Sequence, residues 1–337
     1  MMVAKDRCRR PLALLLLTTL VLLAAPVAAG PPSGKVLRLG LLYGISPKFD
    51  PASNAVDRAL VEGLRSHGYE LGRNTILEFR SAQGNPERLP ELAAELVRLK
   101  VDVLVTRQTA PTLAAREASR TIPIVMLGVA DPVAIGIVAS LARPGGNITG
   151  MGVNAAEISA KRVQLLQEAV PKLSRVAVLW NSTFKAMALG VQQIEMAAPS
   201  LGVTVQSVRV SSSDDFNQAF AAIGQGRPGG LIVLFGPMRG NDLPRIVEFV
   251  TRSRIPTVFE LGQGVRGGGL MEFGPSLSDM ALRIGAYIDK IANGARPADL
   301  PVEEPTRFEL IVNLKAARGM GLVLPQSLLI RADQVIE

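Results

Sequence analysis

Short apolar runs alternate with longer stretches of helical spacing along most of the chain. The run at 101–106 is almost continuously apolar, which is typical of a strand covered on both faces. The stretch at 157–170 instead places Val163, Leu166 and Val170 on one helical face. This alternation predicts βα units, and therefore parallel sheets with helices on both faces.

The series of units occurs twice and then continues in a tail. In the first half we expect strands at 36–43, 75–81, 101–106, 122–127 and 147–150, and helices at 52–67, 89–100, 109–120 and 133–141. In the second half we expect strands at 175–180, 204–210, 231–235 and 257–259, and helices at 157–170, 184–201, 214–223 and 243–253. The tail adds strands near 270–273 and 308–313 and a helix at 277–293.

The doubled series predicts an α/β protein with two doubly wound Rossmann-like lobes joined by hinge strands. The expected first lobe is 36–152 plus 270–296, and the expected second lobe is 153–269 plus 297–337. Residues 30–35 form a linker rich in Gly and Pro.

The first 29 residues have a different pattern, which predicts a signal peptide. Basic residues from Lys5 to Arg10 precede a long uncharged apolar stretch, and Val27, Ala28 and Ala29 provide small residues for cleavage. The expected location is therefore periplasmic or otherwise extracytoplasmic. The alternative is a membrane anchor formed by an uncleaved signal.

Composition excludes several classes of site. Hydrophobic residues are 48% and charged residues 20%, which fits a globular protein, while aromatics at 4% predict an aliphatic core. A single His and a single Cys exclude a His/Cys zinc site and an internal disulfide. Only His67 is available as the base of a catalytic triad, and it is the last residue of a predicted helix, where an interaction with the helix dipole is the expected role.

The net charge does not indicate a nucleic-acid partner. Without 1–29, the basic residues fall from 37 to 33 and the acidic residues from 29 to 28, so the formal charge falls from +8 to +5. The basic residues are scattered and form no stripe with stacking aromatics. We therefore expect no nucleic acid to bind.

A glycine-rich segment matches a phosphate-binding motif only by its letters. Residues 262–267 read GQGVRG, but β-prone residues follow where a helix would have to begin. The segment predicts a turn between the lobes, and no cofactor is expected.

The loops that leave the carboxyl ends of the predicted strands carry the candidate site. In open parallel sheets ligands bind at this edge, and helix N-termini there supply N–H donors. The loops hold mostly small, hydroxyl and amide residues without a convergent acid–base pair, which favours binding of a small polar ligand. The candidate ligand-binding residues are Ser46, Gln108, Thr109, Asp131, Asn181, Phe235 and Glu260.

Six stretches of the chain form a familiar set: 89–105, 122–133, 138–149 (VASLARPGGNIT), 160–181, 274–277 and 298–314 (ADLPVEEPTRFELIVNL). Together they resemble the substrate-binding proteins of ABC transporters that have the type I periplasmic-binding-protein fold, in the branch with tryptophan- and tyrosine-binding proteins. The resemblance implies two lobes joined by three crossing segments, capture of a ligand by hinge closure, and no catalysis. It also implies an ABC permease with its ATPase as partners, and we expect a monomer.

The resemblance carries over to few individual residues. Thr109 matches the hydroxyl turn after the third strand, Asp131 the Asp-Pro after the fourth, and Asn181 the Asn that follows a tryptophan. Arg107 and Gln108 depart from the family pattern. Two readings of Arg107 stay open: it pairs with an acidic ligand, or it points into solvent.

The sequence therefore predicts an extracytoplasmic solute-binding protein that captures a small polar ligand, with an amino acid among the candidates, and delivers it to an ABC transporter. One alternative is a secreted two-lobed α/β enzyme, which would need a carboxylate pair or a phosphate loop. Another is a module of the same fold that senses a ligand for a membrane receptor.

Overall fold

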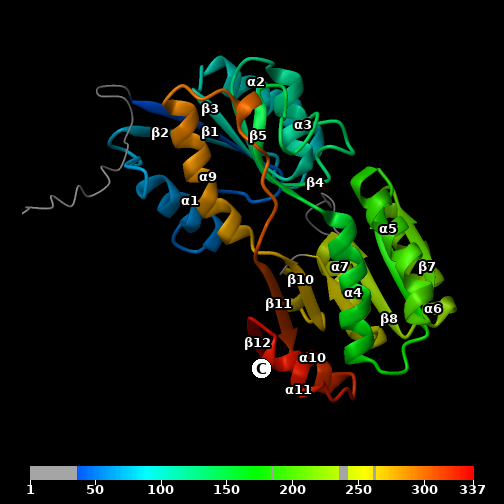
Figure 1. Cartoon of the computed structure of the whole chain (residues 1–337). Coiled ribbons are helices and arrows are strands. Elements are labelled where there is room, and N and C mark those ends of the chain that lie inside the picture. Colours follow the sequence, from blue (N-terminus) through cyan, green and yellow to red (C-terminus); the bar gives the residue numbers. More distant parts are fainter. Residues whose placement is uncertain (1–35, 184, 235–241, 261–262) are drawn as a thin grey trace, which may run out of the picture.

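The computed structural model describes residues 36–183, 185–234, 242–260 and 263–337. The expected signal peptide and linker, and the candidate Phe235, lie outside the described residues. The described chain forms two sheets covered by helices, and we call each sheet with its helices a lobe (Figure 1).

The first lobe contains a five-stranded parallel sheet with the order β2-β1-β3-β4-β5. Its strands are β1 (Leu37–Tyr43), β2 (Thr75–Ser81), β3 (Val103–Arg107), β4 (Ile124–Ala130) and β5 (Ile148–Val153). Its helices are α1 (Ala55–Arg65), α2 (Leu89–Arg98), α3 (Thr109–Ala118) and α9 (Leu277–Ala292). The strand order reverses between β1 and β3, which makes that position the topological switch point of the sheet.

The second lobe contains seven strands in the order β12-β11-β10-β9-β8-β6-β7. They are β6 (Arg175–Asn181), β7 (Thr204–Val210), β8 (Gly230–Leu234), β9 (Thr257–Phe259), β10 (Met271–Pro275), β11 (Phe308–Asn313) and β12 (Gln334–Ile336). The helices are α4 (Ala155–Ala169), α5 (Lys185–Ala197), α6 (Phe216–Gly226), α7 (Asp242–Ser253), α8 (Gln263–Arg266), α10 (Leu314–Gly319) and α11 (Gln326–Ile330).

The second sheet repeats the order of the first. Strands β7-β6-β8-β9-β10 follow the same sequence of neighbours as β2-β1-β3-β4-β5, with the reversal between β6 and β8. Strand β11 then pairs antiparallel with β10 and carries β12 at its far edge. The doubly wound α/β architecture with two lobes is confirmed.

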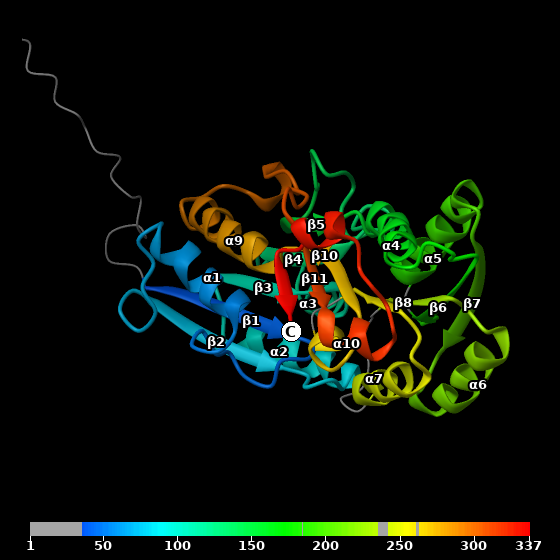
Figure 2. The ribbon, with the colours of Figure 1, turned by 90° about the horizontal axis from the view of Figure 1, so that it is seen from below.

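Three segments cross between the lobes and lie side by side (Figures 1 and 2). They join β5 to α4, β10 to α9, and the turn after α9 to β11. The backbone N–H of Gly152 donates to the carbonyl of Glu303 at 2.9 Å, and that of Ser276 donates to Arg307 at 3.0 Å. These bonds tie the third segment to each of the other two.

The position of β10 corrects the expected division of the chain. The sequence assigned 270–296 to the first lobe, but β10 pairs with β9 and β11 in the second sheet. Only α9 of that stretch packs on the first lobe. Strand β9 has only three residues and pairs with β8 along one edge. Strand β10 pairs in parallel with its other edge and so extends the second sheet.

Two local expectations were wrong. Residues 133–141 form consecutive turns without a helix, because Gly136 takes a positive φ of 72° and the Ile137 N–H bonds to the Pro132 carbonyl. The glycine-rich segment contains the single helical turn α8, which lies within the second lobe near β10 and β11. It does not connect the lobes.

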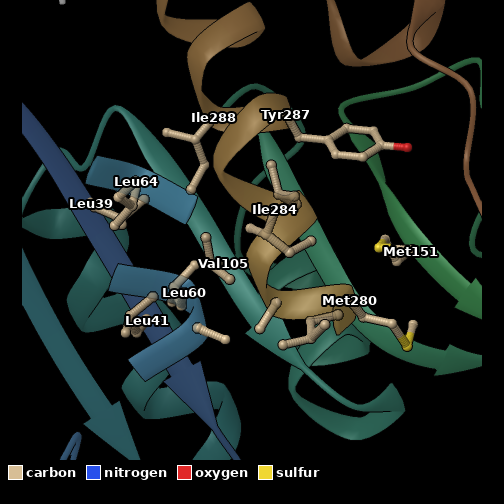
Figure 3. Packing of buried hydrophobic residues seen from close by; sticks show 14 of the residues in the cluster. Leu39, Leu41, Leu60, Leu64, Val105, Met151, Met280, Ile284, Tyr287 and Ile288 are labelled. Atoms are coloured by element: carbon tan, nitrogen blue, oxygen red, sulfur yellow. The ribbon is translucent and has the colours of Figure 1, made fainter. Parts of the chain in front are cut away.

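The core of the first lobe is mostly aliphatic, as the low aromatic content predicted, but it also contains the buried rings of Tyr43, Tyr69 and Tyr287. Figure 3 shows Leu39, Leu41 and Val105 of the sheet facing Leu60 of α1 and Ile284 of α9. All five side chains are fully buried. Helices α1 and α9 therefore cover one face of the first sheet together.

Candidate functional site

The switch point of the first sheet brings Tyr43 and Arg107 together. They are the last residues of β1 and β3 and are partners in the parallel register, so their side chains leave the same face of the sheet. The Arg107 guanidinium lies over the Tyr43 ring, with its carbon 5.5 Å from the ring centre. This distance is within the range of a cation–π contact.

Tyr43 is a rigid support for that contact. Its hydroxyl donates to Asp57 Oδ1 at 3.1 Å, and the ring is buried. Burial raises the pKa of Tyr43 well above its ordinary value, the Asp57 carboxylate raises it further, and Arg107 opposes the shift. The phenol therefore stays neutral over the physiological range.

The chain turns sharply after Arg107 and enters α3. Gln108 takes a positive φ of 75°, and its N–H still bonds to the Leu127 carbonyl at 2.9 Å. Thr109 opens the helix, and its Oγ1 accepts from the Ala130 N–H at 3.4 Å. This contact brings Thr109 beside the end of β4.

Asp131 follows directly at the end of β4. Its φ of 44° is left-handed, and its N–H donates to the Val153 carbonyl at 2.9 Å. The structure therefore gathers Gln108, Thr109 and Asp131 at one edge of the first sheet. Ser46 lies half-buried in the loop after β1, and within the described residues no hydrogen bond joins it to the other three.

In the second lobe, Asn181 takes part in a local turn. Its Oδ1 accepts from the Thr183 N–H at 3.0 Å and from the Thr183 hydroxyl at 2.8 Å. The neighbouring Trp180 donates from Nε1 to Ser207 on β7 at 2.9 Å. The oxygen of the Asn181 amide is thus engaged within its own loop.

Glu260 follows β9 and lies near a buried arginine. The Nη2 atom of Arg162 is 3.9 Å from Glu260 Oε1, and its Nε donates to the Phe273 carbonyl at 2.9 Å. Arg162 is only 1% exposed. Burial lowers its pKa, while Glu260 and Glu272 act in the opposite direction.

Comparison with known proteins assigns the chain to a family. The family described as ABC transporter substrate binding protein matches residues 49–336. The chain belongs to this family. A tyrosine-binding protein of Clostridioides difficile is 26% identical over 275 residues, which are 81% of this chain and 78% of that protein.

Solved structures share the fold of this substrate-binding protein. A conserved domain protein from Vibrio cholerae has a TM-score of 0.81 and 25% identity, and the match covers 89% of this chain and all of the other. An ABC domain from Streptococcus pneumoniae in complex with L-Trp also has a TM-score of 0.81, with 24% identity, over 89% and 99% of the two chains. The type I periplasmic-binding-protein fold expected from the sequence is confirmed.

Two further features of the substrate-binding protein concern membranes and metals. Within the described ranges, no helix combines the length and apolar character that a membrane span needs. The same residues contain no group of three His, Cys, Asp or Glu side chains arranged to hold a metal ion.

Sequence reasoning missed Arg162 and Glu272. Arg162 falls on the same face of α4 as Ile158, Leu165 and Ala169, all of which are buried. An arginine within an apolar helical face is the signal that could have found it. Glu272 lies in β10, the strand that the sequence had assigned to the first lobe. Burial is the main cause that raises the pKa of Glu272 to about 7.

Proposed function

We propose that this protein captures a small polar solute between its two lobes outside the cytoplasm and delivers it to an ABC permease with its ATPase. Membership of the substrate-binding family carries this proposal. The polar strand ends of the first lobe, with Thr109 and Asp131 side by side, supply hydrogen-bonding groups for the solute. An amino acid is the first candidate, because relatives include a tyrosine-binding protein and a complex with L-Trp.

The three crossing segments support a closing motion. They hold the lobes at one side, and a solute that contacts both lobes stabilises the closed arrangement relative to the open one. In this proposal Asp131 and Thr109 contact the solute from the first lobe, and Asn181 and Glu260 from the second. The protein makes and breaks no covalent bond.

A binding screen tests the proposal. Purified protein is mixed with amino acids, organic acids, sugars and polyamines, and melting temperature and calorimetric heat are recorded. We expect one solute class to raise the melting temperature, since binding to the native state alone stabilises it. Asp131→Asn and Thr109→Val should each weaken that binding by about tenfold, which corresponds to one lost hydrogen bond.

The control is Asp214→Asn, which changes an exposed carboxylate of the second lobe. It should leave the affinity unchanged. Steady product formation from any solute would contradict a binding role. Uptake of the bound solute at the same rate in cells that lack this protein would contradict delivery. Recovery of the protein from the cytoplasm would contradict export.

A further inference from the structure

The guanidinium of Arg107 has a nitrogen atom that forms no hydrogen bond within the described part of the chain. Its Nη1 atom is buried and has no hydrogen-bond partner there. The half-buried guanidinium lies over the neutral Tyr43 ring. A buried donor nitrogen without an acceptor is unfavourable, so a ligand that supplies an acceptor there would be stabilised.

The acid that accepts from the Tyr43 hydroxyl is already engaged. Asp57 accepts from the Tyr43 hydroxyl with Oδ1, and its Oδ2 accepts from the Asp50 N–H at 2.9 Å. Asp57 is fully buried on α1. Asp57 therefore fixes the ring that supports the guanidinium and is no ion-pair partner of Arg107.

Helix α3 begins at Thr109, two residues after Arg107, and its N-terminus favours an anion beside the guanidinium. No side chain caps the N-terminus of α3, and its first turn contains no acidic residue. Within the described part of the chain, the N–H groups of Thr109 and Ala110 donate to no backbone carbonyl. Uncapped N–H groups and the helix dipole attract negative charge.

Both features lie at the topological switch point of the first sheet. Arg107 ends β3 next to the last residue of β1, where the strand order reverses. Ligands of doubly wound sheets bind at this reversal. The guanidinium and the start of α3 thus converge where a captured solute is expected.

We propose that Arg107 binds a carboxylate of the captured solute, with the N–H groups of Thr109 and Ala110 as further donors. The proposal rests on the proposed function and narrows the solute to a carboxylic acid. A planar guanidinium matches a carboxylate through two parallel hydrogen bonds, which an ammonium group does not reproduce.

Matched acids and amides test this directly. The probes are L-tyrosine and L-tyrosinamide, L-tryptophan and L-tryptophanamide, 4-hydroxybenzoate and 4-hydroxybenzamide, and succinate and succinamide, with D-glucose as a neutral solute. Affinities are measured by calorimetry for the wild type and for Arg107→Gln, Arg107→Lys and the control Arg98→Gln. Arg98 is exposed near the end of α2, away from the carboxyl edge of the sheet.

We expect an acid to bind at least about tenfold more tightly than its amide. Arg107→Gln should lower the affinity for the acid by about 10- to 100-fold and leave the affinity for the amide nearly unchanged. Arg107→Lys should recover part of the loss, and Arg98→Gln should change nothing. A melting curve for each variant verifies that it is folded.

The outcomes separate the two proposals. If solutes bind but acids and amides bind equally, or if Arg107→Gln keeps the preference for the acid, the role of Arg107 is wrong and solute binding stands. If only glucose binds, the carboxylate class is wrong and solute binding again stands. If the folded protein binds no probe in this panel and no solute in the wider screen, both proposals are wrong.

Discussion

The carbonyl oxygen of Gly63 on α1 lies against Gly285 on α9, so that a Cβ built on Gly285 would be 2.1 Å from that oxygen. A Cβ on Gly63 would likewise be 2.1 Å from the carbonyl oxygen of Leu282. The two helices therefore approach each other backbone to backbone. Together they cover the apolar face of the first sheet (Figure 3).

Gly285→Ala should destabilise the protein by about 3 kcal/mol or more, because the added methyl group meets backbone atoms that cannot rotate away. Denaturant unfolding measures the change. The matched control is Gly224→Ala on α6, where a Cβ would meet nothing within 4 Å. That variant should be slightly more stable, by up to about 1 kcal/mol, from helix propensity. Equal stability of the two variants would contradict the close helix contact.

Glu272→Gln should change how stability depends on pH. The pKa of Glu272 is raised from 4.5 to about 7, so the folded state retains a proton that the unfolded state releases over this range. The free energy of unfolding of the wild type therefore falls as pH rises from about 4.5 to 7. Above that range it falls no further on account of Glu272. The variant should be more stable by about 2–3 kcal/mol at pH 8 and equal at pH 4.

The pH series compares urea unfolding of the wild type, Glu272→Gln and the control Glu91→Gln. Glu91 is exposed on α2. A constant difference between wild type and Glu272→Gln at every pH would show that the carboxyl group does not titrate in this window.

Arg162→Met should cost about 3 kcal/mol of stability, since it removes a buried donor to the Phe273 carbonyl and leaves nearby carboxylates without their cation. The loss should be smaller when Glu272→Gln is already present, because one of those carboxylates is then neutral. Arg98→Met, at an exposed position, is the control. Additive losses in the double variant would contradict coupling between Arg162 and Glu272.

Ser276→Ala should destabilise by about 1–2 kcal/mol. The Ser276 hydroxyl accepts from the Asp279 N–H at 3.3 Å as the N-cap of α9, and it donates to Glu309 Oε1 at 2.5 Å. Thermal unfolding compares it with Ser278→Ala, in the first turn of α9, at a position that is not the helix N-cap. A loss of equal size at Ser278 would argue against the cap.

The sequence pattern predicted helices and strands well where residues within the element itself set its bounds. The strand at 75–81 has the predicted bounds, and α1 lies inside the predicted 52–67. The helix expected at 133–141 did not form, because apolar letters do not reveal the left-handed backbone at Asp131 and Gly136. The pairing of distant strands could not be predicted either. The sequence of β10 does not show which sheet it joins, and its pairing with β9 and β11 assigns it to the second.

The sequence predicted the sheet edge at which the candidate site lies, but it did not predict the contacts among the side chains there. Thr109 accepts from the N–H of Ala130, the residue before Asp131, since adjacent parallel strands end at one edge. The support of Arg107 by Tyr43 could not be predicted, because it depends on the register between β1 and β3. Whether the named residues contact a solute remains a prediction.

Helix α9 completes the first lobe, although it follows β10 of the second lobe in the chain. During synthesis, α1 alone covers the apolar face of the first sheet, and the part that α9 covers stays exposed until residue 292 has left the ribosome. Expression of 36–153 alone would therefore yield an insoluble fragment, whereas a circular permutant that joins α9 directly to β1 would bring the two layers together early.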